Sequence, residues 1–196
     1  TLTASLIAAT PAFASPSDDL AALIKQHWDW QLSENPVMAS SLGVPGYEGK
    51  VGDMSLEAAD KSGKTAQAFL TRLQAIPTDQ LTPLERSNAL ILKRALSDQI
   101  EGNKFGQRTM LFTTYYGWHQ GYAGLGDNSP LRNKADYQSY LDRIAQYPKI
   151  NDEALKITQM AVDKGYVLPC EVLGNSAKGI IGVVNDDPAK SRFYSP

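Results

Sequence analysis

Few residues in this chain have side chains suited to catalysis or metal binding. Among 196 residues there are two histidines, His27 and His119, and one cysteine, Cys170. A helical zinc peptidase needs two histidines one helical turn apart with a carboxylate nearby, so that the imidazoles converge on one ion. His27 and His119 are far apart in the sequence, and neither is followed by Glu or a second His. The sequence therefore predicts no metal ligand and no catalytic residue within this chain.

The sequence also contains no motif typical of covalent catalysis or of nucleotide binding. No Gly-x-Ser-x-Gly elbow is present. Cys170 follows Pro169 near an expected helix start, a setting that can activate a thiol, but we interpret it as a small buried thiol. The segment GYAGLG, residues 121–126, lacks the strand, turn and helix of a dinucleotide site.

The densest aromatic segment is TTYYGWHQGYAGLGDNSP, residues 113–130. Flat apolar faces with polar tips suit contacts to a peptide or a sugar. The alternative is that the rings fill gaps between helices while the glycines permit tight turns. On composition alone both interpretations stay open. The candidate substrate-binding side chains are Tyr115, Tyr116, Trp118, His119 and Tyr122.

The elements that must position this segment are predicted to be helices. Ser17 is the expected N-cap of a first helix that ends at Asn35. Its apolar stripe comprises Leu20, Leu23, Ile24, His27 and Trp28. A Gly- and Pro-rich loop over 40–55 precedes a second helix over 55–76. Thr82 and Glu85 form a capping box for a third helix, whose apolar seam includes Leu84, Ile91, Leu92 and Leu96.

The second half of the chain is predicted to hold two helices and a weaker apolar segment. A connection of about thirty residues, 103–133, carries the aromatic segment; such a length is uncommon unless the loop is functional. A helix follows, with Tyr137, Tyr140, Leu141 and Ile144 on one face, and Pro148 ends it. The next helix begins at Asn151 and ends at Gly165. Residues 179–184 fit a helix or a strand equally well. The predicted fold is all-α with one long aromatic and Gly-rich loop.

The first residues resemble the end of a secretory signal. TLTASLIAATPAFAS is apolar and ends in Ala12-Phe13-Ala14, so residues 1–14 are predicted to be a signal peptide, with its basic start missing, cleaved after Ala14. An ordinary buried helix is the alternative. No Cys follows the cleavage site and the run is too short to span a bilayer, so we expect no membrane anchor. The expected location is periplasmic or secreted.

Composition excludes other classes. The hydrophobic fraction is 42% and the charged fraction 20%, which is ordinary for a globular protein. Net charge is −2 and no Lys/Arg run interleaves with aromatics, so nucleic acid is not an expected partner.

Several motifs occur in an order that matches a known family. They are GWHQGYAGL, then SPLRNKADYQSYLDRIAQYP, VDKGYVLPCEVL and SRFYSP, preceded by ENPVMASSLGVPGYEGKVGDMS. The chain thereby resembles the bacterial family catalogued as domain of unknown function 885, over nearly all of the residues after the signal. The most specific matches are Gly117, Trp118, His119, Asp136, Tyr137, Tyr140, Leu141, Arg143, Gly165 and Pro169.

The resemblance implies a large secreted helical protein similar to zinc metallopeptidases, with residues 15–196 as its N-terminal third, truncated at the C-terminal end. The implied zinc and its His-Glu…His helix would lie beyond Pro196, with a peptide as substrate. The cofactor is therefore expected in the full-length protein and not in this chain. The alternative is a non-catalytic periplasmic binding or structural module. If a C-terminal portion is missing, we expect self-association through exposed Ile180, Ile181, Val183 and Val184.

Overall fold

The computed structural model describes residues 15–112, 117–182, 186–191 and 193–194. The predicted signal peptide lies outside these ranges. Within them the chain is helical, and extended pairing is limited to one isolated antiparallel bridge between Phe112 and Gly117. The all-α prediction is confirmed. No helix in the described ranges combines the length and hydrophobicity needed to cross a bilayer.

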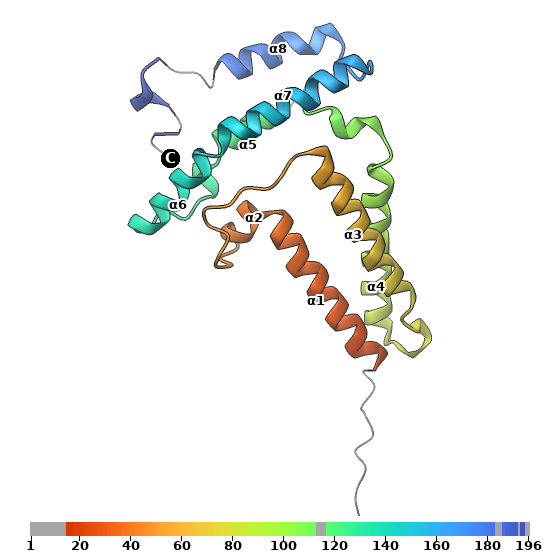
Figure 1. Cartoon of the computed structure of the whole chain (residues 1–196). Helices are drawn as coiled ribbons and strands as arrows, with labels where there is room; N and C mark the ends of the chain where they lie inside the picture. Colours follow the sequence, from red (N-terminus) through yellow and green to blue (C-terminus); the bar gives the residue numbers. More distant parts are fainter. Residues whose placement is uncertain (1–14, 113–116, 183–185, 192, 195–196) are drawn as a thin grey trace, which may run out of the picture.

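Three helices form the first unit, which we call the three-helix unit (Figure 1). They are α1 (Pro16–Glu34), α3 (Leu56–Gln74) and α4 (Pro83–Gly102), with the 3-10 turn η1 (Thr78–Gln80) between the last two. Burial of apolar side chains drives such packing at roughly 25 cal/mol per Å². The shared core consists of Leu20, Leu23, Ala66, Phe69, Leu70, Leu73, Ile76, Leu81, Ala89, Leu92 and Leu96.

Side-chain caps fix where these helices begin. The capping box predicted at Thr82 and Glu85 is confirmed, with both reciprocal hydrogen bonds present. The prediction that Ser17 caps α1 is wrong. Ser15 is the cap, because its hydroxyl accepts from the Asp18 backbone N–H while the Asp18 carboxylate accepts from the Ser15 N–H. The earlier start also places Pro16 in the first turn, where its missing N–H costs nothing.

The apolar seam predicted for α4 is half correct. Leu92 and Leu96 are buried, but Leu84 and Ile91 are exposed, Ile91 at 68%. The buried side of the helix is the one that faces α3, and it includes Ala89. Apolar residues at helical spacing form two neighbouring stripes on α4. The stripe that packs against α3 is buried, and the other is exposed.

The remaining elements form a second layer that meets the three-helix unit at an angle (Figure 1). Its first helix, α2 (Pro36–Ser41), begins directly after α1, in a stretch where a turn and loop were predicted. The connection over 103–133 is not one long loop, because it contains η2 (Gly106–Thr109), α5 (Trp118–Ala123) and η3 (Gly126–Asn128). The later elements are α6 (Lys134–Ile144), α7 (Tyr147–Asp163), α8 (Cys170–Ile181) and η4 (Pro188–Lys190).

The predicted boundary between the fourth and fifth helices is wrong. Asn151 does not begin a helix; α7 begins at Tyr147, with Pro148 in its first turn. A proline there is tolerated because the first N–H groups of a helix have no intrahelical partner. The predicted end at Gly165 is confirmed, since its φ of 75° is a left-handed conformation that favours glycine.

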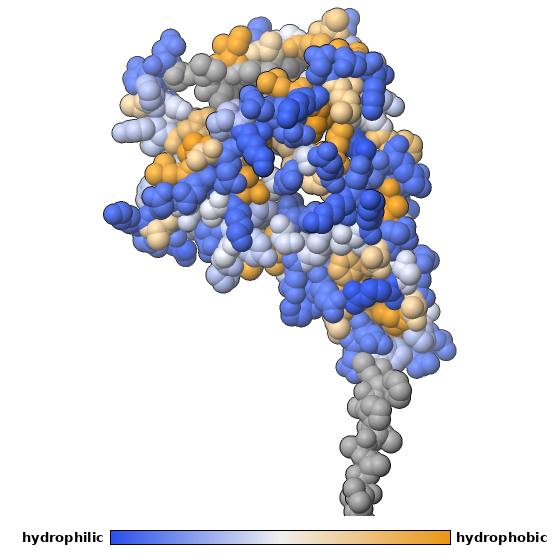
Figure 2. All heavy atoms as spheres, viewed as in Figure 1, coloured by the Kyte–Doolittle hydropathy of each residue, from blue (hydrophilic) through white to orange (hydrophobic). Residues whose placement is uncertain are grey.

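The structure shows in part whether residues 179–184 form a helix or a strand. Residues 179–181 belong to α8, so the segment begins as a helix, while Val183 and Val184 lie outside the described residues. Cys170, predicted to be buried, is an exposed free thiol, because it stands at the first position of a helix that faces solvent. Apolar side chains gather at the surface along the α7 and α8 edge (Figure 2), among them Leu155, Val162, Val167, Leu173 and Ile181.

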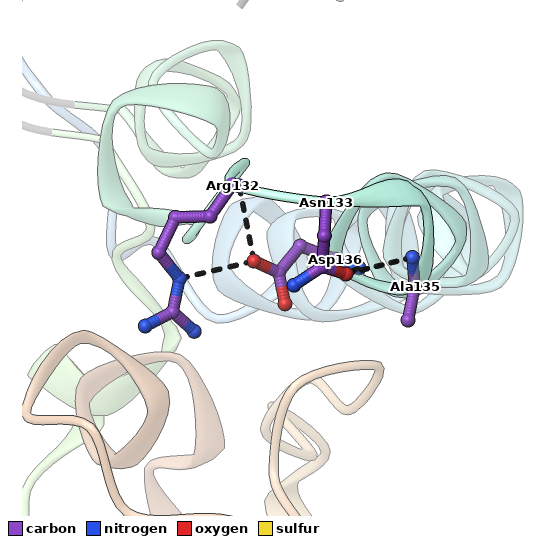
Figure 3. A network of polar contacts seen from close by, with 4 residues as sticks. All are labelled: Arg132, Asn133, Ala135 and Asp136. Carbon is purple, nitrogen blue, oxygen red and sulfur yellow. Dashed lines mark hydrogen bonds and ion pairs between the residues drawn. The ribbon is translucent and has the colours of Figure 1, made fainter.

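The face predicted for α6 is half correct. Tyr140 is buried and Ile144 is half-buried, but Tyr137 and Leu141 are about half exposed, and Asp136 and Arg143 are buried in their place. Asn133 caps the helix by accepting from the N–H groups of Ala135 and Asp136, and the Asp136 carboxylate accepts from the backbone N–H and Nε of Arg132 (Figure 3). These bonds hold the pKa of Asp136 below its usual value.

Arg143 joins α6 to three other segments. Its side chain is fully buried, and it donates from Nε to Lys50 O at 3.0 Å and from Nη2 to Tyr47 O at 3.0 Å. Further donors reach Pro36 O and the hydroxyls of Ser40 and Ser129. No carboxylate in the described ranges forms an ion pair with it, and burial lowers its pKa. Arg143 therefore fixes α2 and the loop over 43–52 against α6 by hydrogen bonds.

Candidate functional site

Three of the five predicted site residues lie on α5. Trp118 and Tyr122 are half-buried, and His119 is 5% exposed. Tyr115 and Tyr116 lie outside the described residues. The segment is thus a short helix in this region, and it brings Trp118, His119 and Tyr122 together within two turns.

These side chains belong to a larger set that we call the aromatic cluster: Phe112, Trp118, His119, Tyr122, Tyr147 and Phe193. Tyr147 lies at its centre, 4.7 Å from Tyr122 and 5.7 Å from Trp118 between ring centroids. Phe193 packs against Tyr147 at 5.9 Å. Sequence reasoning missed both partners, because nothing local links Tyr147 or Phe193 to residues 118–122.

The tyrosine hydroxyls in and next to the cluster differ in their hydrogen bonding. The Tyr140 hydroxyl, from the neighbouring helix α6, donates to Phe193 O at 3.0 Å. The Tyr122 hydroxyl is buried without a hydrogen-bond partner in the described structure. Burial, and then the neighbouring Tyr147, raises the pKa of Tyr122 to about 12, against a weaker opposite effect of Arg143. Tyr122 is therefore a neutral phenol at physiological pH.

The environment of His119 is apolar and tight. Its ring lies 5.8 Å from Phe112 and 6.3 Å from Trp118 between centroids. Gly117 allows this approach, because a Cβ at that position would fall 2.5 Å from His119 Cε1 and 2.8 Å from Phe112 Cδ1. Neither ring nitrogen has a hydrogen-bond partner among the described residues. Burial lowers the pKa of His119, so the ring is neutral at pH 7.

These residues do not fit the zinc ion that the resemblance implies. His27 belongs to the three-helix unit, where it packs edge-on against Trp30 and Phe69 at about 5.5 Å. His119 lies in the aromatic cluster with both nitrogens enclosed. Across the described ranges, no group of three or more His, Cys, Asp and Glu side chains converges to hold a metal. No step of a reaction is therefore assigned to a metal held by these residues.

Beside the aromatic cluster lies a small apolar cavity of about 120 Å³. It is partly open to solvent and is lined by the extended residues Met110, Leu111 and Phe112 together with the last turn of α7 and the start of α8. The Thr158 hydroxyl, on α7, is buried there without a described partner. The cavity suits one apolar side chain.

A larger polar cleft of about 400 Å³ lies between residues 51–57 and the first turns of α7. Asp53 and Lys149 are on opposite sides, and Lys149 helps to hold the pKa of Asp53 below its usual value, after the larger effect of hydrogen bonds from Ser55. Glu57 and Glu153 complete its charged lining. Such a lining offers both signs of charge to a polar ligand.

Comparison with known proteins assigns the chain to one family. The model of the bacterial proteins of unknown function DUF885 matches residues 36–196. No curated protein and no solved structure matches the chain. The matched range includes α2 and every later element, and so all of the aromatic cluster. Because the match covers far more than half of its length, this chain belongs to the bacterial DUF885 family.

Proposed function

We propose that this chain is the N-terminal, non-catalytic helical part of a secreted or periplasmic protein similar to zinc-dependent peptidases, and that it contacts the peptide substrate. The similarity to zinc peptidases comes from the ordered motifs of the sequence. The observation that carries the contact role is the aromatic cluster, whose Trp118 and Tyr122 keep part of each ring on the surface.

The chemistry of these two rings supports a peptide contact. Indole and phenol rings bury large apolar area with few rotatable bonds. Trp118 and Tyr122 are both braced by Tyr147, so little further ordering is required when a ligand binds.

Binding can be tested with a pool of fluorescein-labelled ten-residue peptides of mixed sequence, monitored by fluorescence anisotropy. We expect Trp118→Ala to weaken binding about tenfold, the loss of one buried ring contact. Trp28→Ala is the matched control, because Trp28 is 47% exposed on α1, outside the aromatic cluster. Equal affinities of the two variants, or no binding by the unmodified chain, would contradict the contact role.

The peptidase-like part of the proposal is tested separately. The gene is read beyond the codon for Pro196, and the longer protein is assayed with a quenched fluorescent peptide in the presence of zinc. We expect a His-Glu…His helix in frame and hydrolysis that EDTA abolishes. This chain alone should retain no stoichiometric zinc after gel filtration, since its histidines do not converge. A stop codon directly after Pro196 would favour the alternative, a non-catalytic binding or structural module.

A further inference from the structure

His119 is an unusual buried side chain. Both ring nitrogens are enclosed, and neither has a hydrogen-bond partner in the described part of the chain. Buried polar groups are paired in the great majority of native structures, so an unpaired one calls for an explanation. Its ring is in contact with Phe112 and Trp118, which offer no acceptor for an imidazolium.

Among the described residues, no charged group offsets the effect of burial on the pKa of His119. The ring of His119 lies against Phe112, in the extended residues 110–112, and against Trp118 on its own helix α5, and this helix also contacts α8. The other titratable side chains of the aromatic cluster are the phenols of Tyr122 and, from α7, Tyr147; burial raises the pKa of each, so they remain neutral. On α8, Glu171 and Lys178 are exposed, and neither shifts the pKa of His119; burial is the cause that lowers it.

The helix that carries His119 is short and lacks a side-chain cap at its start. Helix α5 has six residues, and no side chain caps its N-terminus. Elements with few stabilising contacts open locally at a much smaller cost than global unfolding. The described attachments of α5 include the ring contacts of Trp118 and Tyr122 with Tyr147, a backbone hydrogen bond from the Trp118 N–H to Leu111 O at 3.3 Å, and contacts with α8.

We propose that His119 is an acid-sensitive latch: while neutral it holds α5 closed within the aromatic cluster, and its protonation releases α5. An imidazolium has two N–H donors, and both need acceptors. Since neither ring nitrogen has a hydrogen-bond partner among the described residues in the closed arrangement, the protonated ring must move to water. Its movement separates Trp118 and Tyr122 from Tyr147 and loosens the contact of Tyr147 with Phe193. The latch does not depend on the peptidase-like function.

The experiment uses the whole chain and its two histidines as mutual controls. NMR of the two imidazole Cε1–H groups gives each pKa directly, with His27→Phe providing the assignment. Hydrogen exchange of residues 117–125, corrected for intrinsic rates, is measured between about pH 7.5 and about pH 5, the range in which histidine titrates. We expect exchange to accelerate about tenfold or more as His119 becomes protonated.

The variants decide the outcome. Acceleration should persist in His27→Phe and disappear in His119→Phe, which keeps a flat ring but cannot titrate. Equal acceleration in His119→Phe would overturn the proposal. If His119→Phe does not fold, as judged by circular dichroism, the unmodified chain still decides: the midpoint of the exchange change must coincide with the pKa of His119, and separate midpoints would overturn the latch.

Discussion

The three-helix unit and the second layer differ in the polar side chains that they bury, although the second layer also buries apolar side chains such as Leu125 and Ile157. The core shared by α1, α3 and α4 is entirely apolar. The buried polar and charged side chains of the described ranges, Ser40, Thr109, His119, Asp136 and Arg143, all lie on α2 or beyond α4. Apolar packing is non-directional and tolerates repacking, whereas buried hydrogen bonds specify one arrangement. The second layer therefore depends on a few individual residues much more than the three-helix unit does.

The largest effect is expected at Arg143. Arg143→Met should lower the free energy of unfolding by about 4 kcal/mol, because each buried acceptor left unpaired costs about 1 to 3 kcal/mol. Arg143→Lys keeps the charge but lacks the planar fork, so it should recover only part of this loss. Chemical denaturation is the measurement. Arg94→Met is the control, because Arg94 is exposed on α4 and its ion pair with Asp98 should contribute under about 1 kcal/mol. A loss at Arg143 no larger than at Arg94 would show that the second layer does not depend on it.

The corresponding change in the three-helix unit is Leu96→Ala. Leu96 is fully buried, and its truncation should cost about 3 kcal/mol through lost burial and a cavity. Leu90, on the same helix, is exposed, and Leu90→Ala should change stability by less than about 0.5 kcal/mol. Thermal or urea unfolding followed by circular dichroism compares the two. Similar costs for both would mean that the apolar core is not arranged as described.

A third substitution, Gly117→Ala, adds a methyl group to the closely packed aromatic cluster. Gly117→Ala should destabilise the aromatic cluster by about 2 kcal/mol, since overpacking of this size typically costs 1 to 3 kcal/mol. Gly102→Ala is matched to it, because nothing lies within 4 Å of a Cβ there and alanine favours the helix by about 1 kcal/mol. Opposite signs in the two unfolding curves are expected. Stabilisation by both substitutions would contradict the close packing of His119 against Gly117.

The smallest effect is a pH dependence from the three-helix unit. Burial lowers the pKa of His27 below its usual 6.5, so the unfolded chain binds more protons between the two pKa values. Stability is therefore constant above about pH 6.5 and falls as the pH drops through this window. His27→Phe should reduce the slope of unfolding free energy against pH between about 5 and 6.5. A slope unchanged by this substitution would show that His27 titrates alike in both states. Carboxylates with lowered pKa values, such as Asp18 and Glu85, change the dependence of stability on pH only at lower pH.

Local signals explain which elements could be predicted. The start of α4 follows from Thr82, Pro83 and Glu85, and the range of α3 follows from Ser55 and a single apolar seam. These features act over one or two turns. The family was also accessible from the order of short motifs, which the family match confirms.

The second layer could not be predicted in the same way. The apolar periodicity of α6 predicts that its aromatic side is buried. The side that carries Arg143 is buried as well, because Arg143 donates hydrogen bonds to acceptors in residues near 36–50. The short helix α5 has no side-chain cap, contains Gly121 and is flanked by Gly117 and Gly124, so no local pattern predicts it. The two additional aromatic partners of the site, Tyr147 and Phe193, meet it only through tertiary packing.

The hydrogen bonds of Arg143 also bear on the order of folding. Those to Lys50 and Pro36 join residues 93 and 107 positions apart, whereas α3 and α4 pack against each other across a short turn. Closing a longer loop costs more chain entropy, and contacts between distant residues tend to form late. Arg143 should therefore have a φ-value near zero, so that its loss chiefly accelerates unfolding. The residue that fixes the second layer then governs how long the folded state lasts more than how quickly it is reached.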